Sequence, residues 1–146
     1  MNYTMMGDTV NLAARLESSA KQYGVYNFVG ENIYEKTKRE FVFRFLDFVK
    51  VKGKNIPVKV YELVNSKNNI NNKTLKLVQL FEKGLDKYYK KKWGDALTLF
   101  QKSEEMEEKF TSRNTNPSLI YIERCKIFIE DPPDKNWDGV WTMTSK

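Results

Sequence analysis

The sequence contains no histidine and a single cysteine, Cys125, in 146 residues. Without imidazole there can be no Ser-His-Asp or Cys-His triad, no histidine-ligated zinc and no histidine acid–base chemistry. A lone cysteine cannot form an internal disulfide, which is typical of a reducing compartment. Any catalysis must therefore use carboxylates, lysine, arginine, amides, or metal ions held by oxygen ligands.

Glycine and proline are scarce, with 7 and 4 residues, and no apolar run approaches the roughly 18 residues of a membrane-spanning helix. The sequence also opens without the basic and apolar stretches of a secretory signal. We therefore expect a cytoplasmic chain with no membrane segment of its own, and any membrane tether would lie upstream in a parent protein. A composition of 40% hydrophobic and 14% aromatic residues is sufficient for a hydrophobic core.

The net charge of +6 is spread over both halves of the chain and forms no basic tail. The densest basic cluster, residues 90–92, lies within a helical pattern and indicates a solvated turn more than a phosphate-binding patch. We therefore expect no nucleic-acid partner.

A polar, asparagine-rich stretch at residues 65–73 predicts a linker, because it lacks hydrophobic periodicity. It separates residues 1–64 from a helical segment at 74–130, which a tail at 131–146 follows. The elements expected before the linker are a helix over about 9–22 capped by Asp8 and stopped by Gly24, a strand over 26–29, a helix over 31–38, and strands over 41–51 and 58–64. This order predicts an α+β fold.

Three amphipathic helices are expected after the linker, the third beginning at Pro117. The spacing of Gly84, Ala96 and Phe100 resembles a tetratricopeptide repeat, although Ser103 replaces the expected alanine. A repeat-like helical hairpin and an unrelated bundle both remain open, and binding of a protein partner would be a function beyond packing. The two tryptophans of the tail are expected to pack back on the helices, and Cys125 is expected to be a buried thiol.

One motif, at residues 7–17, carries candidate chemistry: Gly-Asp-Thr-Val-Asn-Leu-Ala-Ala-Arg-Leu-Glu. On a helix, Asn11 and Arg15 are four residues apart, so their side chains leave the same face about 6 Å apart at Cβ. Taken alone, this pattern favours a solvated helix face.

The motif, followed by Val-Lys-Gly-Lys at 51–54 and Pro-Val-Lys-Val-Tyr-Glu-Leu at 57–63, resembles the C-terminal half of a class III nucleotidyl cyclase catalytic domain. The resemblance covers residues 1–64. It implies a partial ferredoxin-like sheet-and-helix unit, followed here by the small all-α helical-hairpin segment.

The activity implied is that of a phosphorus–oxygen lyase in intracellular signalling, which converts ATP to 3′,5′-cyclic AMP and pyrophosphate with two Mg²⁺ or Mn²⁺ ions. By the resemblance, Asn11 orients the ribose and Arg15 stabilises charge on the α-phosphate, for which a planar guanidinium is suited. Lys52 would hold the outer phosphates, and Thr4 would accept from the adenine amino group.

The family's two metal-binding aspartates belong to elements expected upstream of residue 1, and neither Asp8 nor Asp47 matches them. We therefore expect a piece of an adenylate cyclase that is inactive alone. Class III sites form between two catalytic domains, so a second cyclase domain is the expected partner in a dimer. The alternative is a non-catalytic protein-interaction module that contains an inert cyclase remnant.

Overall fold

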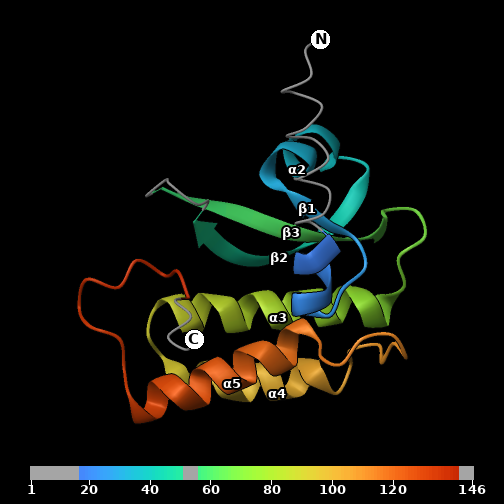
Figure 1. The fold of residues 1–146 in the computed structure, drawn as a ribbon. Coiled ribbons are helices and arrows are strands. Elements are labelled where there is room, and N and C mark those ends of the chain that lie inside the picture. The colour runs from blue at the N-terminus through green and yellow to red at the C-terminus, as the bar shows by residue number, and fades with distance from the viewer. Residues whose placement is uncertain (1–16, 51–55, 142–146) are drawn as a thin grey trace.

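The computed structural model describes residues 17–50 and 56–141 (Figure 1). Its sheet is antiparallel, with strand order β1-β3-β2, and it is combined with α-helices, which confirms the predicted α+β class. Residues 17–23 are helical. The other elements are β1 (Phe28–Gly30), α2 (Glu31–Thr37), β2 (Phe41–Lys50), β3 (Pro57–Ser66), α3 (Asn72–Tyr89), α4 (Trp93–Glu104) and α5 (Pro117–Glu130).

Several helix ends follow from the residues at their boundaries. Gly24 ends the first helix with a φ of +76°, a conformation that glycine adopts without strain, as expected from the sequence. The Asn116 side chain caps α5 by accepting a 2.9 Å hydrogen bond from the Leu119 amide, and Pro117 takes the first helical position, as predicted. The expected cap at Asp8 lies outside the described residues.

Strands β2 and β3 form the predicted antiparallel pair, which runs from Phe41 opposite Ser66 to Lys50 opposite Pro57. The register shifts twice along β2, between Val42 and Phe43 and between Phe45 and Asp47. β1 pairs with the other edge of β3. The strand and the following helix extend into the asparagine-rich stretch, so the connection between them spans residues 67–71.

The sheet and the helices bury one continuous core across that stretch. Figure 1 shows α3, α4 and α5 stacked below the same face of the sheet. The helices therefore cover apolar surface that residues 1–64 alone would expose to water. The core takes Val25, Phe28, Leu46 and Val60 from one side of the stretch and Phe81, Leu85, Phe100 and Tyr121 from the other.

Helices α3 and α4 form the expected helical hairpin, and a glycine allows their close contact. A β-carbon at Gly84 would lie 2.7 Å from Cε1 of the buried Phe100 ring. Whether the hairpin is a tetratricopeptide repeat stays a prediction, because this packing is common to many helix pairs.

We expect Gly84→Ala to lower the free energy of unfolding by about 1–3 kcal/mol, because the added methyl group overpacks the contact with Phe100. Urea denaturation measures the change. Gly94→Ala is the matched control: Gly94 also lies in a helix, but a β-carbon there meets nothing within 4 Å, so its effect should be neutral or stabilising. Equal stability of the two variants would contradict the packing account.

The tail packs back on the helices, as predicted. The ring of Trp137 lies with its centroid 5.5 Å from those of Tyr88, Trp93 and Phe128. Cys125 is a fully buried thiol, also as predicted. Burial raises its pKa to about 12, although the nearby Arg124 charge acts in the opposite direction.

Among residues 17–50 and 56–141, no helix combines the length and the apolar character needed to cross a lipid bilayer.

Candidate functional site

The four predicted site residues, Thr4, Asn11, Arg15 and Lys52, lie outside the described residues. Their roles therefore stay predictions. The structure describes the elements that continue from them in sequence. The helix at 17–23 directly follows the motif, and the pair Lys50–Pro57 marks the two strand ends between which Lys52 falls.

The helix at 17–23 is fixed to the sheet through its inner face. Ala20 and Tyr23 are both buried. The Tyr23 ring stacks on Phe28 with centroids 5.6 Å apart, and its hydroxyl donates a 2.6 Å hydrogen bond to Oδ2 of Asp47 in β2. The helix at 17–23, which directly follows the motif in sequence, therefore has a defined position relative to β2.

Asp47 is 1% exposed and collects polar contacts from three helical segments. Besides Tyr23, Nη1 of Arg124 in α5 lies 2.9 Å from Oδ2, and the Tyr89 hydroxyl of α3 lies 3.4 Å from Oδ1. Burial raises the pKa of the Tyr23 hydroxyl, and the Asp47 charge raises it further, so the hydroxyl stays protonated at neutral pH and donates its hydrogen bond to Asp47. We call Tyr23, Asp47, Tyr89 and Arg124 the Asp47 hub.

A second buried charge on β2, Arg44, joins the sheet to the segment after α4. Its guanidinium donates to Oε1 of Glu62 from Nη2 at 2.7 Å and to Oε2 of Glu107 from Nη1 at 2.6 Å. Glu107 also accepts a 2.7 Å hydrogen bond from the Ser118 hydroxyl. Burial alone would lower the pKa of Arg44, but the two carboxylates outweigh it and raise the pKa. We call Arg44, Glu62 and Glu107 the Arg44 cluster.

Neither the Asp47 hub nor the Arg44 cluster was predicted from the sequence. Arg44 and Asp47 interrupt an apolar run in β2, whereas Arg124 stands between Glu123 and Cys125 in α5. A charge in such a run signals burial with a partner, because an unpaired buried charge is costly. The apolar run of β2 therefore indicated that Arg44 and Asp47 would be buried and paired, but not with which residues.

The described residues do not supply a set of metal ligands. Within 17–50 and 56–141, no three acidic or cysteine side chains gather closely enough to hold an ion. The Mg²⁺ or Mn²⁺ ions that the resemblance implies therefore have no fitting ligand set in this part of the chain, and we assign no step to metal ions held by these residues.

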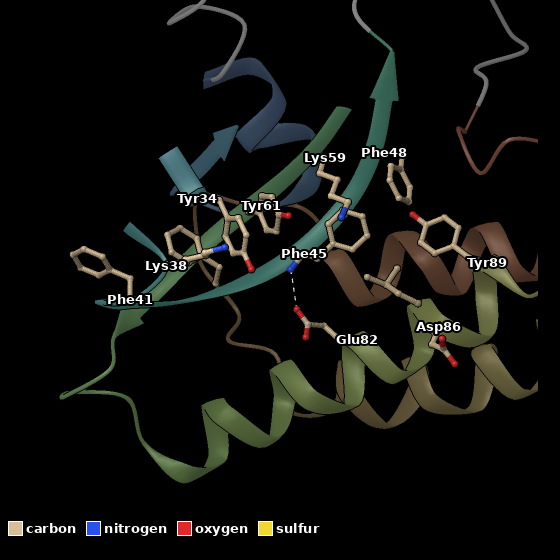
Figure 2. A pocket seen from close by; sticks show the side chains of 12 residues that line it. Tyr34, Lys38, Phe41, Phe45, Phe48, Lys59, Tyr61, Glu82, Asp86 and Tyr89 are labelled. Carbon is tan, nitrogen blue, oxygen red and sulfur yellow. Dashed lines mark hydrogen bonds between the residues drawn. The ribbon is translucent and has the colours of Figure 1, made fainter. Parts of the chain in front are cut away.

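An aromatic groove of about 640 Å³ lies between the sheet and α3 (Figure 2). Tyr34 and Tyr61 stack in it with centroids 4.0 Å apart, and the Lys59 amine lies 5.9 Å from the centre of the Phe45 ring. Burial raises the pKa of Tyr61 to about 12. Glu82 of α3 accepts a 3.0 Å hydrogen bond from the Phe45 amide at the groove's edge. Aromatic rings dominate the described lining, which is typical of a contact surface.

Three curated adenylate cyclases are similar to this chain. The terminal-differentiation specific adenylate cyclase of Dictyostelium discoideum is 35% identical over 130 residues, which cover 86% of this chain and 6% of that protein. Adenylate cyclase 1 of Rhizobium meliloti is 37% identical over 71 residues, or 49% of this chain and 11% of that protein. The adenylate cyclase of Anabaena cylindrica is 38% identical over 63 residues, or 41% and 12%.

These similarities relate the chain to adenylate cyclases, although it spans only 6 to 12% of the length of these relatives. No family model and no solved structure matched the chain. An alignment over 86% of the chain must include most of the helical segment wherever it begins. The Dictyostelium relative is therefore similar to this chain in α3–α5 as well as in the sheet.

Proposed function

We propose that this chain is the C-terminal half of a class III adenylate cyclase catalytic domain with a tetratricopeptide-like helical extension, acting in the cytoplasm. The observation that carries the proposal is the motif at residues 7–17 in a chain related to adenylate cyclases. The described β2–β3 pair supports it. Of the two later stretches that resemble the cyclase family, residues 57–63 lie in β3, and residues 51–54 fall between the two strands in sequence.

In the proposed reaction, the ribose 3′-hydroxyl of ATP gives up its proton to solvent and its oxygen attacks the α-phosphorus. The bond from that phosphorus to the bridging oxygen breaks, and pyrophosphate leaves. Asn11 holds the ribose in position, and the Arg15 guanidinium stabilises charge that develops on the α-phosphate. Lys52 binds the outer phosphates, and Thr4 accepts from the adenine amino group. Divalent metal ions, when bound, neutralise phosphate charge.

We propose that the chain alone does not cyclise ATP and that a second cyclase domain supplies the metal-binding aspartates. The hydrophobic core of this chain supports a role in which the chain contributes Asn11 and Arg15 to a shared site, because α3–α5 cover one face of its sheet. A half-domain whose sheet has one face covered by helices buries a larger fraction of its surface than residues 1–64 alone, so it is more stable.

The test is complementation between two purified proteins. This chain is mixed with a cyclase domain that retains its metal-binding aspartates but lacks its motif arginine, and cyclic AMP is measured with Mg²⁺ or Mn²⁺. We expect cyclic AMP from the mixture and none from either protein alone. If the chain is folded by circular dichroism and the mixture stays inactive, the enzymatic proposal fails and a non-catalytic interaction module is favoured.

A further inference from the structure

The Asp47 hub joins four segments that are far apart in sequence. Asp47 lies in β2, Tyr23 in the helix at 17–23, Tyr89 at the end of α3 and Arg124 in α5. The side chains of the other three residues approach the Asp47 carboxylate, and Asp47 is 1% exposed. The backbone amide of Phe48 also donates to Oδ1 at 2.9 Å, which holds the carboxylate in place.

Arg124 depends on this carboxylate. Its guanidinium lies between the rings of Tyr121 and Trp141, 4.7 and 4.9 Å from their centres. Nη1 has no aligned hydrogen-bond partner among the described residues, so the charge of Asp47 is its main compensation. Because a buried charge without a partner is costly, α5 is held to β2 at this point.

We propose that Tyr23 and Asp47 are positioning residues that fix the helix at 17–23 against β2, with Arg124 of the helical extension compensating the Asp47 charge. The functional part of this inference rests on the proposed function. Tyr23 follows Arg15 by eight residues, and Lys52 follows Asp47 by five. The hub therefore ties together the two chain segments that lead to the predicted phosphate-binding residues, and α5 supplies the cation that completes it.

The hub is tested first without any activity assay. Tyr23→Phe removes the hydroxyl bonded to Asp47 but keeps the ring stacked on Phe28 and the Asp47–Arg124 pair. Hydrogen exchange of the intact chain should show the amides of residues 17–23 exchanging about tenfold faster or more, which corresponds to the loss of a hydrogen bond to a charged group.

Tyr121→Phe is the matched control. It removes a buried hydroxyl that also donates a 2.6 Å hydrogen bond to β2, at the Leu46 carbonyl, but from α5 instead of the helix at 17–23. The control should leave exchange at residues 17–23 changed no more than in the rest of the core. Equal local effects of the two substitutions would overturn the hub as the anchor of the helix at 17–23.

The second readout is kinetic and uses the complementation mixture. Tyr23→Phe should lower kcat about tenfold to a hundredfold with little change in KM, because small misplacements of positioned groups are costly in rate. Tyr121→Phe should stay within about twofold of the unmodified chain. A matching fall in the control would overturn the positioning role. A local exchange effect with no cyclic AMP from any mixture would support the hub and reject the proposed function.

Discussion

Arg44→Met is expected to lower the free energy of unfolding by about 3–5 kcal/mol, or to prevent folding. The substitution keeps an apolar chain of similar length but leaves the carboxylates of Glu62 and Glu107 without the cation that compensates them. Removing one member of a buried ion pair is costly because the remaining charge keeps its desolvation penalty. Urea denaturation followed by circular dichroism measures the loss.

An exposed ion pair on the same strand gives the control. Lys50 in β2 contacts Asp138 at 2.7 Å, but the two side chains are 38% and 44% exposed. Lys50→Met should change stability by no more than about 1 kcal/mol, because solvent screens exposed pairs. Adding Glu107→Gln to Arg44→Met should recover part of the loss. Equal losses for Arg44→Met and Lys50→Met would contradict the role given to the Arg44 cluster.

Arg15→Ala is expected to lower cyclic AMP formation in the complemented assay by about 10² to 10³. The estimate follows from the effect of deleting one donor that stabilises charge in a transition state. Arg15→Lys should recover little of the rate, because an ammonium cannot reproduce the planar, two-pronged contact of a guanidinium with phosphate. Initial rates at saturating ATP measure both variants.

The control for Arg15 is another arginine in the same half of the chain. Arg39 is exposed in the turn that follows α2. Arg39→Ala removes the same charge and should leave the rate within about twofold. A comparable fall for Arg39→Ala would indicate that net charge, and not the motif position, determines the rate.

Local patterns predicted much of the fold. The density of aromatic and β-branched residues, with a turn-rich connection between the two stretches, predicted β2 and β3 to within a few residues. Gly24 and Pro117 marked helix ends because their backbone preferences act locally. The tail tryptophans were also placed correctly, since large aromatic side chains seek burial.

Long-range pairing could not be predicted in the same way. Arg44 and Glu107 are separated by 63 positions, and neither residue type nor spacing selects that partner. The composition of residues 65–73 predicted a linker between residues 1–64 and the helical segment. The described parts of the two segments share one hydrophobic core, because α3 and α5 carry apolar residues that pack with those of the sheet. The predicted site residues rest on motif resemblance, and the described residues do not test them.

The most direct test of the central claim is a titration of the complemented cyclase. Increasing amounts of this chain are added to a fixed concentration of the metal-competent, arginine-deficient domain, and the initial rate of cyclic AMP formation is measured. With unmodified Arg15, we predict that the rate rises with the concentration of this chain and then saturates. With Arg15→Ala, we predict a rate lower by about 10² or more. A rate that is the same for both chains, or that does not rise with the folded chain, would contradict the central claim.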